Sequence, residues 1–88
     1  MTETDVRTQI REFILMEFMD GADPSELTDD LSFEAGHIVD SVGMMDLIMF
    51  LEETFEFEVE NEEALPDNFD SVDLLTQFVL RKRQAVSA

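Results

Sequence analysis

The sequence contains no cysteine, tryptophan or tyrosine, and it has only three glycines and two prolines among 88 residues. Without cysteine the chain has no disulfide, no thiolate metal ligand and no thiol nucleophile, so a stable fold must come from packing alone. This composition is compatible with a reducing compartment, and we expect the cytoplasm. The length suits one small domain spanning residues 1–88.

Positive charge is also scarce. Five Lys and Arg stand against 22 Asp and Glu, which gives a net charge of -17, and no Lys or Arg occurs between Arg11 and Arg81. Nucleic acid and anionic membrane surfaces are therefore poor partners, whereas a basic protein surface is a good one. The alternative interpretation is that the acidity serves solubility alone.

Long hydrophobic runs are missing as well. No apolar stretch approaches the roughly 20 residues that a bilayer span needs. The N-terminal residues lack the uninterrupted apolar segment and small-residue cleavage site of a signal peptide. We therefore predict neither a membrane span nor a signal peptide.

What the sequence does have is helical periodicity. Apolar residues recur at spacings of three and four in three segments, which predicts helices over about residues 5–19, 41–55 and 71–83. Thr4 or Asp5 is the expected cap of the first helix, and a short turn over about 61–65 should be stopped by Pro66. The predicted fold class is an all-α small bundle of three main helices plus one or two short helices.

The first two helices are joined by an unusually long loop, from Asp20 to Val39. Within it, Asp23-Pro24-Ser25-Glu26 has the pattern of a capping box with proline at the first helical position, which predicts a single helical turn. Leu27, Leu31 and Phe33 are spaced to hold this loop against the core.

The predicted helix over 41–55 carries more apolar side chains than one buried face requires. Met44, Leu47, Ile48, Leu51 and Phe55 form a core stripe. A second set points elsewhere and is accompanied by acids: Val42, Met45, Asp46, Met49, Glu52 and Glu53. Methionine adapts to several partners, so this set is a candidate partner-binding surface. Alternatively, the three apolar residues contact the long loop or are scattered surface hydrophobes.

Asp-Ser-Val occurs twice, at Asp40-Ser41-Val42 and at residues 70–72. A catalytic serine needs a base within reach, and the single histidine, His37, fits a polar contact of the loop better. Neither serine lies in a Gly-x-Ser-x-Gly elbow, and no phosphate-binding glycine loop or calcium-binding loop is present. We therefore expect no catalytic residues and no metal site.

The order of these features resembles the acyl carrier protein family. The resemblance rests on Asp40-Ser41-Val42 before an amphipathic helix ending in Leu51-Glu52-Glu53-Thr54-Phe55, on the following Phe57-Glu58-Val59, and on Asn68-Phe69-Asp70-Ser71-Val72. It covers nearly the whole chain. It implies that Ser41, with Asp40 as the adjacent motif residue and helix cap, carries a 4′-phosphopantetheine arm derived from coenzyme A. Ser71 is then an ordinary helix start.

The resemblance also implies the partners. These are a phosphopantetheinyl transferase, a ligase that activates an acyl or amino acid, and downstream synthase or transferase enzymes. The chain would be a monomeric, non-catalytic carrier that holds its cargo as a thioester. The alternative is an unmodified acidic interaction module with a carrier-like fold.

The motif differs from that of carriers in fatty acid synthesis, which typically have Gly-Ala before Asp-Ser and an acid two residues after the serine. Here Ile38 and Val39 precede Asp40, and Gly43 replaces the acid. This pattern is similar to free-standing aminoacyl, D-alanyl and specialised acyl carriers, which favours secondary metabolism. Two explanations of Gly43 stay open: it admits the arm or a partner backbone, or the helix simply tolerates it.

Overall fold

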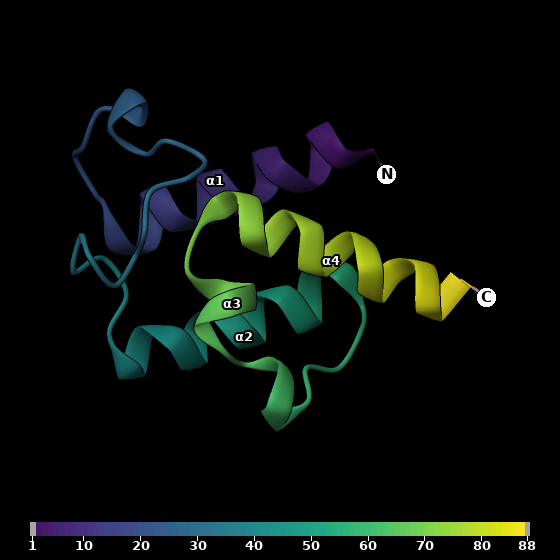
Figure 1. Ribbon diagram of the computed structural model, residues 1–88. Helices are drawn as coiled ribbons and strands as arrows, with labels where there is room; N and C mark the ends of the chain where they lie inside the picture. Colours follow the sequence, from purple (N-terminus) through teal and green to yellow (C-terminus); the bar gives the residue numbers. More distant parts are fainter. Residues whose placement is uncertain (1, 88) are drawn as a thin grey trace.

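The computed structural model describes residues 2–87, with side chains described as far as Arg83, and this part of the chain is helical without strands. The elements are α1 (Glu3–Phe18), a 3-10 turn η1 (Pro24–Glu26), α2 (Ser41–Phe55), a second 3-10 turn η2 (Asn61–Glu63), α3 (Pro66–Phe69) and α4 (Val72–Ser87) (Figure 1). The predicted all-α bundle of three main helices with short additional helices is confirmed.

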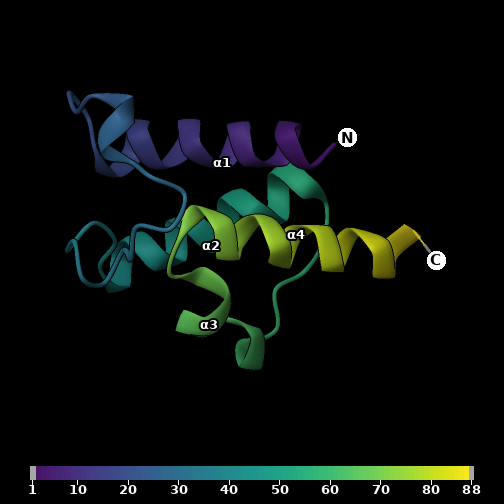
Figure 2. The ribbon, with the colours of Figure 1, turned by 45° about the horizontal axis from the view of Figure 1, so that its top comes forward.

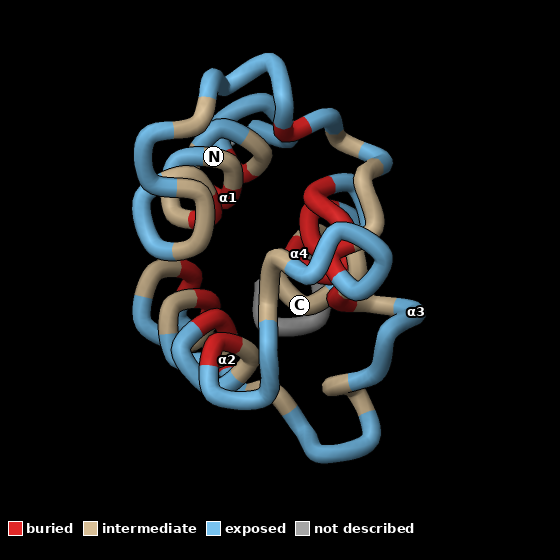
Figure 3. The backbone as a smooth tube through the Cα atoms, turned by 90° about the vertical axis from the view of Figure 1, so that its left-hand side faces the viewer, coloured by how far each residue is buried: buried red, intermediate tan, exposed pale blue. Residues whose placement is uncertain are grey.

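The three long helices lie side by side, with α1 running antiparallel to α2 and α4 (Figure 2). Their buried positions face one another across a common core (Figure 3). The side chains of this core come from every long helix and from the connecting segments: Val6, Ile10, Ile14, Leu27, Phe33, Leu47, Leu51, Phe55, Phe57, Phe69, Val72, Leu75, Phe78 and Val79.

Helix α1 begins earlier than the sequence pattern predicts. Thr2 is the N-cap: its hydroxyl accepts a hydrogen bond from the Asp5 N–H at 3.2 Å, and the Asp5 carboxylate accepts one from the Thr2 N–H at 3.2 Å. The expectation of a cap at Thr4 or Asp5 is therefore wrong, because this reciprocal capping box satisfies two backbone donors that a later start would leave unpaired.

Pro66 begins a helix, whereas the sequence pattern assigned it the end of one. It is the first residue of α3, which follows η2 after Leu65. Proline suits this position because its ring already has a helical φ and because the first N–H of a helix has no intrahelical partner. The residues between α2 and α4 thus form two successive turns, and α3 packs against α4.

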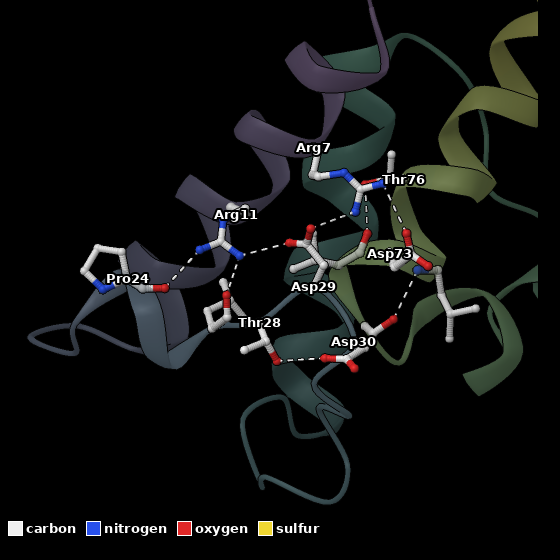
Figure 4. A network of polar contacts seen from close by, with 12 residues as sticks. Arg7, Arg11, Pro24, Thr28, Asp29, Asp30, Asp73 and Thr76 are labelled. Carbon is white, nitrogen blue, oxygen red and sulfur yellow. Dashed lines mark hydrogen bonds and ion pairs between the residues drawn. The ribbon is translucent and has the colours of Figure 1, made fainter.

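The long loop between α1 and α2 is held by two arginines of α1 (Figure 4). Arg7 contacts Asp29 at 3.2 Å and Asp73 of α4 at 3.1 Å. Arg11 contacts Asp29 at 3.0 Å and donates to the carbonyl oxygens of Pro24, at 2.9 Å, and Leu27. The predicted turn η1 and the burial of Leu27 and Phe33 are confirmed.

The remaining three Lys and Arg residues, all on α4, hold the end of α2 and the segment that follows it. Lys82 Nζ lies 2.9 Å from Glu63 Oε1, Arg81 donates to Asn68 Oδ1 at 2.9 Å, and Arg83 donates to the Phe55 carbonyl oxygen at 3.4 Å. The pKa of Glu63 is lowered by a hydrogen bond from the Glu60 N–H and by the nearby Lys82 ammonium. Partial desolvation acts in the opposite direction but does not outweigh them. Every Lys and Arg side chain therefore makes a contact within the fold.

Candidate functional site at the start of α2

Asp40 fixes the start of α2. Its side chain accepts a hydrogen bond from the Gly43 N–H at 2.7 Å, and its carbonyl oxygen accepts the first helical hydrogen bond, from the Met44 N–H, at 2.8 Å. The N–H groups of Ser41 and Val42 precede that first bond and face the open end of the helix. Such a helix N-terminus favours an anion, because its N–H groups can donate to the anion and the positive end of the helix dipole lies there.

Ser41 is the first residue of α2 and is exposed. It lies at the edge of an open groove of about 610 Å³ between the N-terminal half of α2, the end of the long loop and α3. The lining is mainly apolar and comprises Phe33, Glu34, Val39, Asp40, Ser41, Met44, Ala64, Leu65, Pro66, Phe69 and Asp70. A group attached to the Ser41 hydroxyl therefore has both open solvent and an apolar surface within reach.

Asp70, at the base of the groove, holds one of its walls. Its carboxylate accepts hydrogen bonds from the Ser32 hydroxyl at 2.5 Å and from the Glu34 N–H at 3.0 Å. Its carbonyl oxygen accepts a third, from the Phe33 N–H, at 2.8 Å. One residue at the end of α3 thus fixes loop residues that line the groove, which sequence spacing alone did not indicate.

The second Asp-Ser-Val sequence has a different structure. Ser71 is only 5% exposed, and its hydroxyl accepts a hydrogen bond from the Leu74 N–H at 3.1 Å. The prediction that Ser71 caps the last helix is confirmed. The two serines are therefore chemically distinct: one hydroxyl is exposed at the groove, and the other is buried and engaged.

Gly43 leaves room for the side chain of Phe18. A Cβ at this position would lie 2.6 Å from Cε1 of Phe18, a distance that real Cβ atoms essentially never show. Neither explanation offered by the sequence is correct, because Gly43 is buried and faces α1, away from any arm or partner. The glycine allows the aromatic ring at the end of α1 to pack against the first turn of α2.

The second apolar set on α2 is exposed. Val42 is 70% exposed, Met45 66% and Met49 54%, so contact with the long loop is ruled out as the reason for their presence. Asp46 and Glu53 are exposed beside them. Glu52 differs, because it is half-buried and its carboxylate accepts a hydrogen bond from the Val59 N–H at 2.9 Å. It holds the segment after α2 and is less available to a partner than its neighbours.

His37 lies in the turn before the groove, exposed and with a left-handed φ of 54°. Among the described residues, no hydrogen bond joins its ring to Ser41. No group of three His, Asp or Glu side chains in the described part of the chain is placed to hold a metal ion. None of the described helices has the length and apolar character to cross a membrane.

Comparison with known proteins finds carrier proteins. The chain is 36% identical over 63 residues to acyl carrier protein 2, mitochondrial, of Arabidopsis thaliana, a match that covers 72% of this chain and only 48% of that relative. It is 35% identical over 65 residues to the acyl carrier protein of Rubrobacter xylanophilus, covering 74% of this chain and 78% of the relative. It is 31% identical over 81 residues to the D-alanyl carrier protein of Streptococcus sanguinis, covering 92% and 99%. No protein-family model matches the chain.

Proposed function

Because the chain belongs to the acyl carrier protein family, we propose that it carries an acyl or aminoacyl group as a thioester on a 4′-phosphopantetheine arm attached to Ser41. The observation that carries the proposal is the position of Ser41: an exposed hydroxyl at the N-terminus of α2, at the edge of an apolar groove. As a carrier, the chain has no catalytic activity of its own.

The residues around Ser41 fit such an arm. The N–H groups of Ser41 and Val42 at the start of α2 are suited to the negative charge of a phosphodiester. Asp40 holds these groups in place through the cap to Gly43. The arm supplies the thiol that this cysteine-free chain lacks.

The attachment reaction requires a second protein. In the proposed reaction a phosphopantetheinyl transferase activates the Ser41 hydroxyl and transfers the arm to it from coenzyme A. The exposure of Ser41 suits this arrangement, since a transferase must reach the hydroxyl from outside.

Further partners would load and unload the carrier. We assign them to the exposed face formed by Val42, Met45, Asp46, Met49 and Glu53, which combines apolar side chains with negative charge. Partners with basic surfaces fit this face, because complementary charge accelerates encounter and fixes orientation. They comprise a ligase that activates an acyl or amino acid and a synthase or transferase that accepts it.

The cargo and setting form the finer part of the proposal. The apolar residues before Asp40 and the D-alanyl relatives favour a free-standing carrier for an amino acid or a specialised acyl group in secondary metabolism. We place it in the cytoplasm as a monomer. Mass spectrometry of the carrier purified from its native host would identify the cargo directly.

The attachment site has a matched control within the chain. Incubation with coenzyme A and a phosphopantetheinyl transferase should add one arm to the wild-type protein, seen as a single increase in intact mass. Ser41→Ala should abolish the increase, and Ser71→Ala should retain it, since the Ser71 hydroxyl is buried and engaged with Leu74. Modification at Ser71 would overturn the assignment. An unmodified wild-type protein would instead support the acidic interaction module.

A further inference from the structure

A second apolar surface lies along the seam between α1 and α2. Phe13 and Phe50 stack there with ring centroids 4.1 Å apart and an interplanar angle of 12°. Both rings are only half-buried. Open hollows of about 300 Å³ and about 210 Å³ lie on the two sides of this pair, and we call the whole surface the α1–α2 furrow.

The furrow is bordered by two exposed methionines, one from each helix. Met16 of α1 is 75% exposed and lines one hollow, and Met49 of α2 lines the other. Two aromatic rings and two flexible thioethers thus form an apolar surface that draws on both helices. Such surfaces mark interaction sites, and methionine suits them because it adapts to its partner.

The charge around the furrow has one sign. The acids that line the two hollows are Glu12, Glu17, Asp46 and Glu53. No basic residue lines either hollow, because Arg7 and Arg11 of α1 contact the long loop and α4, and the other three basic residues contact groups on or before α3. A ligand for this surface must therefore bring its own positive charge.

We propose that the α1–α2 furrow binds a basic amphipathic segment of a partner protein, with a large apolar side chain over the Phe13–Phe50 pair and Lys or Arg side chains beside the bordering acids. The negative border disfavours an anionic membrane surface. It also disfavours a second copy of this chain, which carries the same net charge of -17.

This binding would be independent of the attachment site. Ser41 begins α2, and Phe50 lies nine residues further on, or about 13 Å along the helix axis. The furrow opens between α2 and α1, whereas the groove at Ser41 opens between α2, the long loop and α3. A partner in the furrow therefore leaves the Ser41 hydroxyl itself uncovered. It shares Asp46, Met49 and Glu53 with the face that we assign to the loading enzymes, so it competes with them for those side chains.

The test uses a synthetic helical peptide with Leu on one face flanked by Lys, and a scrambled peptide of the same composition. Binding to the full chain is followed by two-dimensional ¹⁵N–¹H NMR. We expect the first peptide to shift the amides of Phe13, Met16, Met49 and Phe50 most, and the scrambled peptide to bind at least about threefold more weakly. Shifts confined to the exposed face around Val42 and Met45 would overturn the proposal.

Matched variants distinguish the effect of acids at the furrow on peptide binding from the effect of the overall net charge. The pair Glu12→Gln and Glu17→Gln should weaken peptide binding about threefold to tenfold. The pair Glu58→Gln and Glu62→Gln, which removes the same charge from exposed positions elsewhere, should weaken it less than twofold. Equal weakening by both pairs would refute a specific site.

The apolar part is tested at exposed positions, so that the fold is retained. Met16→Ser should weaken binding, whereas Leu74→Ser, at an exposed position of α4, should not. Ser41→Ala should bind the peptide like the wild type, so the result stands apart from the outcome of arm attachment. Concentration-dependent shifts of the furrow amides without peptide would show that a second copy is the occupant and would overturn the proposal.

Discussion

The contact between Gly43 and Phe18 gives a sharp test of the packing that positions Ser41. In Gly43→Ala the new Cβ would lie 2.6 Å from Phe18 Cε1 and 3.3 Å from Cζ, so the ring must move. The ring packs edge-on against Phe13 at a centroid distance of 5.8 Å, which limits the space available to it. The substitution thus forces an adjustment at the junction of α1 and α2.

Two effects of opposite sign determine the result. Overpacking of this kind costs about 1–3 kcal/mol, whereas replacing a helical glycine by alanine gains up to about 1 kcal/mol. We therefore expect Gly43→Ala to lower the free energy of unfolding by up to about 2 kcal/mol in the wild type. In a Phe18→Leu background the smaller side chain removes the clash. Gly43→Ala should then raise the free energy of unfolding by up to about 1 kcal/mol.

The assay is urea denaturation of the four proteins of this double-mutant cycle, followed by far-ultraviolet circular dichroism. The coupling between the two positions should be at least about 1 kcal/mol. The contact between the new Cβ and Asp40 Oδ1, at 3.1 Å, is present in both backgrounds and cancels in the cycle. If Gly43→Ala changed stability equally in both backgrounds, to within about 0.5 kcal/mol, the ring would not be the reason for the glycine.

Three further predictions concern the polar contacts. Asp70→Ala should lower the free energy of unfolding by about 1–3 kcal/mol in urea denaturation, because it leaves the Ser32 hydroxyl and the Glu34 N–H without their acceptor; an unchanged stability would contradict this role. The pKa of Glu63 is lowered from its ordinary 4.5 in the folded state, so its contribution to stability is present above about pH 4.5 and lost as the pH falls through the folded pKa. Glu63→Gln should therefore show a shallower fall in melting temperature on acidification than Glu62→Gln, and identical profiles would refute the assignment. Finally, adding sodium chloride at neutral pH should raise the melting temperature, since it screens the repulsion within a chain of net charge -17; a decrease would show that the ion pairs of Arg7, Arg11 and Lys82 dominate instead.

The sequence predicts the parts of the fold that depend on periodicity and local capping. The α2 bounds, the turn after Asp23 and the capping role of Ser71 are all encoded within a few neighbouring residues. The start of α1 was misplaced because Thr2 and Thr4 are both good caps, and only the reciprocal bond with Asp5 selects Thr2. Pro66 was misread because proline both ends one helix and begins the next.

Features that depend on contacts between distant segments could not be predicted in this way. The packing of Phe18 on Gly43 joins residues 25 positions apart, and the bonds of Asp70 to Ser32 and Glu34 join the end of α3 to the long loop. The groove beside Ser41 exists only once these contacts form. The sequence indicated the serine through the family resemblance, but not the apolar surface beside it.

The distribution of charge connects the fold to its proposed function. All five Lys and Arg side chains hold segments of the fold together: two bind the long loop, and three bind the end of α2 and the residues that follow it. The ion pairs and hydrogen bonds that shape the groove therefore also remove every cation from the exposed faces of α2. A neutral chain could place basic residues beside Met45 or Met49 and shield the acids there, whereas in this chain that charge must come from a partner. Asp46→Lys would test this link, because it should weaken association with a basic partner while the contacts of Arg7, Arg11 and Lys82 stay in place.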